Sequence, residues 1–304
     1  MGAKEMHEGL VLYRDFWDIK QPGIFYFFLV GGKLFGFNEF GIHLLELLYW
    51  IFFCVILIWF LAKYIFKDKL WLAAVSSLLV VGSYYICAGT GKLTQVEALA
   101  NFPLLMIVVF NYLYLISEQN RNVWLLLSGI AAGAVILLKL IFLPILGFLY
   151  ILLVVRSFRN NRSISLNLAE IFIVAAGFII ACLPFIIYCI KYQIGNLVLE
   201  TFFITPTKVI AQAEHKSIQH LIVSVLGFFP RIAFVVLVFL YGAYHFRKNP
   251  FVQDMIAWVT AGLFVILIQR TSWWGYHSNY YMPLWELLLL LVLKESRKCI
   301  FFSN

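Results

Sequence analysis

One short segment near the start of the chain concentrates residues that could do chemistry. It covers residues 13–23 and reads YRDFWDIKQPG. Its cations, Arg14 and Lys20, are of the two types that bind phosphate, arginine as a bidentate fork and lysine as a point charge. Its carboxylates, Asp15 and Asp18, have the oxygen ligands that divalent cations prefer, and a carboxylate can also accept a proton in catalysis. The segment predicts a polar site with both carboxylates as candidate catalytic residues, against the alternative of a solvated loop.

Two further charged residues lie beside or inside apolar stretches. Glu97 stands at the start of one apolar run, and Lys139 interrupts another. A carboxylate at a membrane boundary is costly unless it is paired or hydrated, so Glu97 is a third candidate catalytic residue. Lys139 is a candidate ligand for a lipid phosphate. The alternative is that its ammonium group snorkels to the membrane surface without a specific partner.

A second polar cluster lies near the end of the chain, at residues 269–281, and reads QRTSWWGYHSNYY. Arg270 and His277 are candidate donors to a phosphate, and the histidine could instead bind a metal or carry a proton. The aromatic residues of this cluster predict a substrate loop, against the alternative of an aromatic belt at the membrane surface. The aromatic candidates are Trp273, Trp274 and Tyr276.

The composition of the chain is that of a membrane protein. Of its 304 residues 63% are hydrophobic and 12% are charged, and the mean hydropathy is +0.92. Soluble domains are about half apolar and about a quarter charged. The net charge of +8 fits basic cytoplasmic loops and an anionic substrate, so nucleic acid is not an expected partner.

We predict an all-α, polytopic transmembrane protein with about nine spans. An apolar helix at 22–36 would be about 22 Å long, which is too short to span, so we expect it to lie in the membrane interface. Residues 1–304 are expected to form one domain, with 1–41 as an outer loop and interfacial helix and 42–304 as a transmembrane bundle. The predicted spans are 42–66, 70–88, 96–116, 123–138, 141–155, 168–190, 221–244, 252–268 and 283–293.

The basic residues predict how the spans are oriented. When every span is counted, the loops rich in lysine and arginine fall on one side, which is then the cytoplasmic side of the cytoplasmic membrane. The segment 13–23, the stretch 191–219 and the cluster 269–281 share the outer side as loops. The N-terminus would also lie outside, so we expect a further transmembrane helix before Met1 in a complete protein.

The motifs resemble those of a known family. Residues 9–23, GLVLYRDFWDIKQPG, followed by the LFG of residues 34–36, resemble the first outer loop and interfacial helix of GT-C membrane glycosyltransferases. The resemblance is to the dolichyl-phosphate-mannose–protein mannosyltransferase type, which includes bacterial aminoarabinose transferases of lipid A. Residues 269–283 resemble the element that precedes a late helix in this family. Glu97 and Lys139 fall where its members carry an acidic residue and a lysine.

The resemblance implies a sugar donor carried on a polyprenyl phosphate and inverting transfer to a protein, lipid or glycan acceptor at the outer membrane face. Lys20 would bind the donor phosphate, and Asp15 and Asp18 would organise the loop or the acceptor. Membrane lipids are the other expected partners. No cofactor is implied with certainty, and a divalent metal stays open. The further candidates for phosphate binding are Arg14, Lys139, Arg270 and His277.

The same resemblance raises the question of the catalytic base. Family members usually carry an acidic pair a dozen or more residues before the position of Gly9, directly after a first transmembrane helix. We therefore expect this chain to be a truncated or inactive copy. Two other classes remain as alternatives, a lipid-linked sugar flippase or transporter and an O-antigen polymerase or ligase. Transporters tend to carry repeats and broken helices near the membrane midplane, whereas the polar residues here gather on one side.

Overall fold

The computed structural model describes residues 2–67, 69–88, 93–117, 119–159, 164–212, 237 and 239–268, and their regular elements are helices. The predicted all-α class is confirmed. The chain divides into two compact units. The first unit comprises Met1–Leu48 and Leu99–Glu214, and the second comprises Tyr49–Ala98 and His215–Asn304. Whether the whole chain forms one domain stays a prediction.

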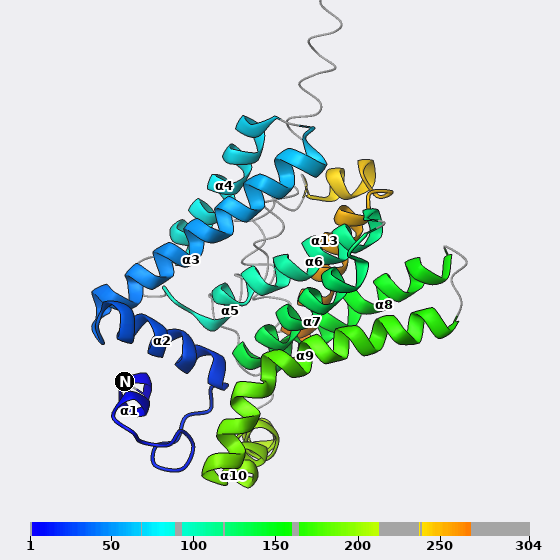
Figure 1. The fold of residues 1–304 in the computed structure, drawn as a ribbon. Coiled ribbons are helices and arrows are strands. Elements are labelled where there is room, and N and C mark those ends of the chain that lie inside the picture. Colours follow the sequence, from blue (N-terminus) through cyan, green and yellow to red (C-terminus); the bar gives the residue numbers. More distant parts are fainter. Residues whose placement is uncertain are drawn as a thin grey trace, which may run out of the picture. The chain divides into compact units, whose positions relative to one another are not determined.

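The helices of the described residues follow the apolar pattern of the sequence (Figure 1). Their bounds are α1 Gly2–His7, α2 Pro22–Phe35, α3 Glu39–Phe60, η1 Leu61–Ile65, α4 Leu70–Ala88, α5 Val96–Leu99, α6 Asn101–Ile116, α7 Arg121–Leu138, η3 Leu140–Phe142, α8 Leu143–Arg159, α9 Ile164–Tyr192, α10 Gly195–Leu199, η4 Glu200–Ile204, α11 Thr205–Gln212 and α13 Pro250–Ile268.

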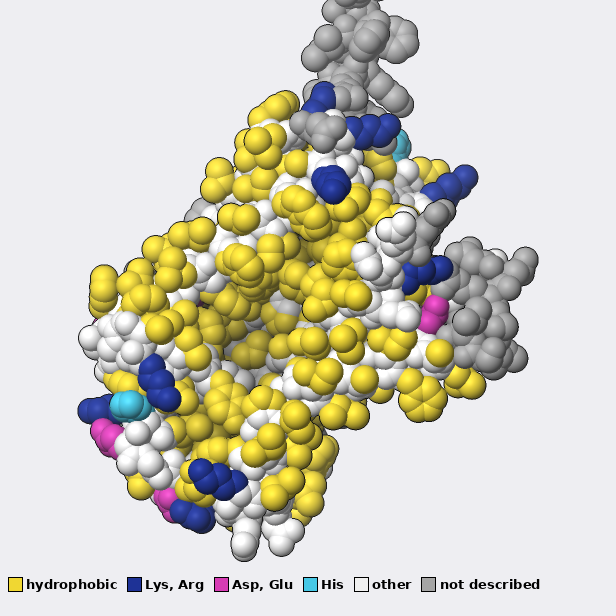
Figure 2. All heavy atoms as spheres, viewed as in Figure 1, with side chains coloured by type: hydrophobic (Ala, Val, Ile, Leu, Met, Phe, Trp, Pro, Cys, Tyr) yellow, Lys and Arg dark blue, Asp and Glu magenta, His cyan; other side chains and the backbone are white. Residues whose placement is uncertain are grey.

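Five helical segments of the described residues are long and apolar enough to cross a membrane, so the chain is a multi-pass membrane protein. Hydrophobic side chains cover most of the face drawn in Figure 2. The predicted total of nine spans stays a prediction, because 283–293 and most of 221–244 lie outside the described residues. The five segments are Glu39–Ile65, Val96–Ile116, Arg121–Leu138, Leu140–Arg159 and Leu168–Tyr192.

The structure agrees with the expected helix boundaries at Lys139 and differs from them after Tyr192. The predicted break at Lys139 is confirmed, since its backbone is extended between α7 and η3. The expectation that 191–219 forms a loop is wrong up to Gln212, because α10, η4 and α11 make this part helical. Its placement on the outer side stays a prediction. The charged residues of this stretch favour a loop. Apolar residues lie between these charges, and Ile194 is fully buried.

Helices α7 and α9 of the first unit approach each other until their backbones touch. A Cβ atom on Gly129 of α7 would collide with the carbonyl oxygen of Val174, and one on Gly177 of α9 would collide with that of Leu126. Gly133 continues the contact one turn further along α7. Lipid tails are as apolar as leucine, so helix association in a bilayer depends on close packing, which small residues permit.

A polar network adds to this packing inside the first unit. The Ser128 hydroxyl of α7 donates to the Asn111 side-chain oxygen of α6 over 2.9 Å. The Tyr150 hydroxyl of α8 donates to the Ser128 carbonyl oxygen over 3.0 Å. These bonds link three helices at one level, and each is worth about 0.6 kcal/mol on average in a membrane protein.

The second unit has an aromatic core of its own. The ring centroids of Trp50 in α3 and Tyr84 in α4 lie 4.8 Å apart, and those of Phe60 and Phe251 lie 5.2 Å apart. The Tyr84 hydroxyl also accepts the backbone N–H of Thr94, the residue that leads into α5. Tyr84 therefore joins the packing of α4 to the turn that positions Glu97.

The glycine contacts make a testable prediction about stability. We expect Gly129→Leu to separate α7 from α9 and to lower the free energy of unfolding by at least about 1–3 kcal/mol, as overpacked cores do. Thermal unfolding in detergent measures the change. Gly147→Ala is the control, because a Cβ at Gly147 of α8 would meet nothing within 4 Å. An unchanged melting temperature for Gly129→Leu would show that the close approach is not needed.

Candidate functional site

The carboxylate of Asp15 closes a tight turn in the loop between α1 and α2. Its Oδ2 accepts the backbone N–H of Val11 at 2.8 Å, and its own N–H donates to the Val11 carbonyl oxygen at 2.9 Å. Tyr13, inside this turn, has a φ of +71°, which is uncommon for a residue other than glycine. Such a backbone persists only where its surroundings fix it. The turn is therefore held by side-chain contacts as well as by its own hydrogen bonds.

Asp15 also forms a bidentate pair with Arg14. The Nε of Arg14 donates to Oδ1 at 2.9 Å, and its Nη2 donates to Oδ2 at 3.1 Å. The hydrogen bond from Arg14 and then the N–H of Val11 hold the pKa of Asp15 below its usual value, and the same pairing raises the pKa of Arg14. A carboxylate with a lowered pKa is a weaker base, so this geometry suits Asp15 to ordering the loop rather than to accepting a proton.

Asp18 arranges the second half of the same loop around Lys20. Its Oδ1 accepts the backbone N–H of Lys20 at 3.0 Å, and its Oδ2 lies 3.8 Å from the Lys20 ammonium. The Tyr13 hydroxyl donates to the Lys20 carbonyl oxygen at 2.7 Å. The backbone of Lys20 is thus held at its N–H and at its C=O, while its side chain stays 58% exposed. An exposed ion pair contributes little to stability, and the ammonium can also contact an anion.

The loop is docked on the far end of α9 and on η4. The Tyr188 hydroxyl of α9 accepts the backbone N–H of Leu12 at 2.9 Å. The indole Nε1 of Trp17 donates to the Thr201 hydroxyl of η4 at 3.2 Å. These partners are 176 and 184 residues apart in sequence, so nothing local in the chain signalled Tyr188 or Thr201 as part of the site.

Aromatic rings extend this docking surface. Tyr13 meets Phe202 edge to face, with centroids 5.7 Å apart. The Arg14 guanidinium carbon lies 6.0 Å from the centroid of the Tyr192 ring, at the outer limit of a cation–π contact. Four residues of the α9–η4 region, Tyr188, Tyr192, Thr201 and Phe202, therefore contact the loop.

The start of α2 lies against the end of α7. A Cβ on Gly23 would lie 2.6 Å from the carbonyl oxygen of Leu137, so the two backbones touch there. Lys20 comes shortly before Gly23, and Lys139 comes shortly after Leu137. The two predicted phosphate ligands therefore flank one helix contact. The N-terminus of α2 adds the positive end of its dipole at the same place.

The other predicted residues are Glu97 and the basic and aromatic residues of 269–281. Glu97 is in α5 of the second unit and is 4% exposed. Within the described part of the chain, no group of three or more His, Cys, Asp or Glu side chains could hold a metal ion. The metal therefore stays an untested expectation. Arg270, Trp273, Trp274, Tyr276 and His277 lie outside the described residues.

A family model described as dolichyl-phosphate-mannose-protein mannosyltransferase matches residues 20–188, which is more than half of the chain. The chain belongs to this family. The match confirms the resemblance found in the sequence, and it favours a transferase over the flippase, transporter and O-antigen alternatives. The match begins at Lys20 and includes Lys139 and Tyr188.

The fold of this mannosyltransferase-family chain is similar to a solved one, "Crystal Structure of ArnT from Cupriavidus metallidurans bound to Undecaprenyl phosphate". The TM-score is 0.72 at 15% sequence identity, over 96% of this chain and 54% of that chain. The chain thus spans about half the length of that protein. No curated protein sequence matches the chain.

The role given to Asp15 predicts the effect of removing its charge. Asp15→Asn should break the pair with Arg14 and speed amide hydrogen exchange at Val11 and across the loop, measured by mass spectrometry. Because the pKa of Asp15 is lowered in the folded protein, its ionised carboxylate stabilises the folded loop. This stabilisation is fully present above the pKa of an unfolded aspartate, about 3.9, and is lost as the pH falls through the pKa of Asp15 in the folded protein. Glu8→Gln, in an exposed pair with Lys4, is the control. Equal loop exchange in all three proteins at neutral pH would contradict this role.

The docking on α9 makes a separate prediction. Tyr188→Phe removes the acceptor of the Leu12 N–H, and a buried donor left without a partner costs about 1–3 kcal/mol. We expect faster exchange at the Leu12 amide and unchanged exchange in α6. Tyr192→Phe is the matched control, because it keeps the ring beside Arg14. If the two variants behave alike, the hydroxyl of Tyr188 does not hold the loop.

Proposed function

We propose that this chain transfers a sugar from a polyprenyl-phosphate donor to an acceptor hydroxyl at the outer face of the cytoplasmic membrane. The observation that carries the proposal is the fixed backbone and exposed ammonium of Lys20 at the start of α2. Family membership supports the reaction class. The structure of ArnT, similar in fold, was solved with undecaprenyl phosphate, which supports a donor of this chemistry.

The charges around Lys20 suit a phosphate. Arg14 is neutralised by Asp15, so its part is to keep the loop in shape. Lys20 and Lys139 flank the contact of α2 with α7, where the helix dipole of α2 adds partial positive charge. Trp17 is 59% exposed, and an amphipathic ring of this kind anchors a loop at the level of lipid headgroups.

The proposed step follows from these positions. The acceptor oxygen attacks the anomeric carbon from the side opposite the phosphate, the bond from that carbon to the phosphate oxygen breaks, and the sugar inverts. Lys20 stabilises the charge that gathers on the departing phosphate. The acceptor proton passes to a carboxylate. Asp15 is the weakest candidate for this base, and Asp18, which lies in the same loop as Lys20, is the one that we propose. The catalytic role that the sequence predicts for Glu97 is tested beside it.

The phosphate site can be tested by removing Lys20. Purified Lys20→Ala should bind polyprenyl phosphate about 10- to 100-fold more weakly, because a charge-assisted hydrogen bond is worth about 1.5–3 kcal/mol. Native mass spectrometry or equilibrium binding measures the change. Lys33→Ala is the matched control, since Lys33 lies in the last turn of α2, at the end away from Lys20.

Transfer is measured with a panel of polyprenyl-phosphate sugars, with and without EDTA, on the wild type and on the Asp18→Asn and Glu97→Gln variants. Loss of transfer with retained donor binding would identify the base. If the wild type neither binds polyprenyl phosphate nor transfers any sugar of the panel, the proposed function is wrong.

A further inference from the structure

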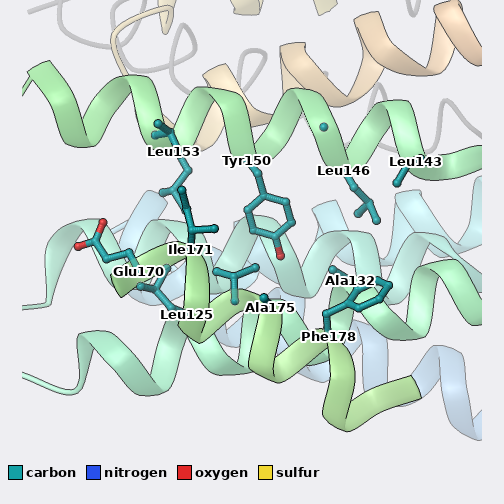
Figure 3. Close-up of a pocket in the computed structure, with 13 residues that line it drawn as sticks. Leu125, Ala132, Leu143, Leu146, Tyr150, Leu153, Glu170, Ile171, Ala175 and Phe178 are labelled. Atoms are coloured by element: carbon teal, nitrogen blue, oxygen red, sulfur yellow. The ribbon is translucent and has the colours of Figure 1, made fainter. Parts of the chain in front are cut away.

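A groove of about 440 Å³ opens between α8 and α9 in the first unit, with α7 as its floor (Figure 3). The groove exists because α9 packs closely on α7 through the glycine contacts, whereas α8 and α9 meet over a much shorter length. Its walls are apolar apart from Tyr150 and Glu170. The labelled wall residues are Leu125, Ala132, Leu143, Leu146, Tyr150, Leu153, Glu170, Ile171, Ala175 and Phe178.

The surroundings of the groove are hydrocarbon. Helices α7, α8 and α9 each contain a segment that is long and apolar enough to span a membrane. Leu143 and Ile171 at the groove are 58% and 48% exposed, so the groove opens toward the lipid. Its volume lies within the range of about 300–1,000 Å³ that is typical of small-molecule sites. Walls of this kind do not hold ordered water, which needs polar partners, and they fit an acyl chain.

One end of the groove is charged. Figure 3 shows Glu170 at this end, with its carboxylate directed away from the apolar row. The Ser157 hydroxyl of α8 donates to Oε2 of Glu170 at 3.3 Å. Arg156 and Arg159 stand on either side of Ser157 in the last turn of α8. The carboxylate of Glu170 is complementary to the ammonium of a lipid headgroup, and the two arginines are complementary to its phosphate.

We propose that this groove binds one phospholipid with a primary-ammonium headgroup, phosphatidylethanolamine, as a structural lipid. An acyl chain lies along α8 and α9, the ammonium donates hydrogen bonds to Glu170, and the phosphate lies by the arginines. A choline headgroup has no N–H to donate, and a glycerol headgroup has no positive charge. The ethanolamine headgroup is therefore the one that the carboxylate selects.

This site is separate from the proposed donor site. Glu170 lies near the start of α9, whereas the loop that carries Lys20 docks on Tyr188 near its end. The two positions are about 27 Å apart along the helix at 1.5 Å per residue. The lipid site therefore does not depend on sugar transfer, and either proposal can fail without the other.

Native mass spectrometry of the full purified chain tests the site. The protein is incubated with an equimolar mixture of phosphatidylethanolamine, phosphatidylcholine and phosphatidylglycerol, and the retained lipid is identified. The wild type is expected to retain one phosphatidylethanolamine in preference to the other two. Glu170→Gln should lower that preference about tenfold or more, because it removes a charge-assisted hydrogen bond. Ala175→Trp, which fills the groove, should abolish retention of any lipid there.

Two controls make the outcome decisive. Glu8→Gln changes an exposed carboxylate that does not line the groove, and Lys20→Ala changes the proposed donor site. Both variants should therefore retain phosphatidylethanolamine as the wild type does. Equal retention of the three lipids by the wild type would overturn the proposal. The proposal is also wrong if Glu170→Gln leaves the selectivity between the three lipids unchanged. Displacement of the retained lipid by added polyprenyl phosphate would contradict it as well.

Discussion

The backbone contact between α7 and α9 is the constraint on which the first unit depends. It requires glycine at Gly129 and Gly177, because any side chain there would meet a carbonyl oxygen of the other helix. Once α9 is fixed against α7, its C-terminal end presents Tyr188 at a set position. The end of α7 is fixed in the same way against Gly23 of α2. Both supports of the loop 13–23 are thus set by one helix pair.

The charges of the loop are used in two different ways. Arg14 and Asp15 neutralise each other and fasten the turn at Val11, so their pairing determines shape. Asp18 holds the backbone N–H of Lys20 and lies at a looser distance from its ammonium. A close bidentate pair is stronger than a single contact at 3.8 Å, so of the two cations Lys20 is the one that an incoming phosphate can recruit at lower cost.

The helices and the loop motif could be predicted from the sequence, because both depend on residues that are close together in the chain. The bounds of α4 and the break at Lys139 agree with the apolar runs and their interruptions. Tyr188 and Thr201 could not be predicted, because one lies in a continuous apolar helix and the other in a stretch interpreted as a loop. Only the fold brings them to Leu12 and Trp17. The position of Glu170 at a groove could not be predicted either, since a single carboxylate near the start of an apolar run does not indicate a groove.

Helix α9 connects the two proposed sites physically. Among the described helices, α7 makes by far the most extensive contact with α9, and the contact of α9 with α8 is short. A lipid that fills the space between α8 and α9 would add packing on the second side of α9. A ligand that binds only the folded arrangement stabilises that arrangement by mass action. The position of Tyr188, and with it the order of the loop around Lys20, would then depend on the composition of the bilayer as well as on the sequence of the chain.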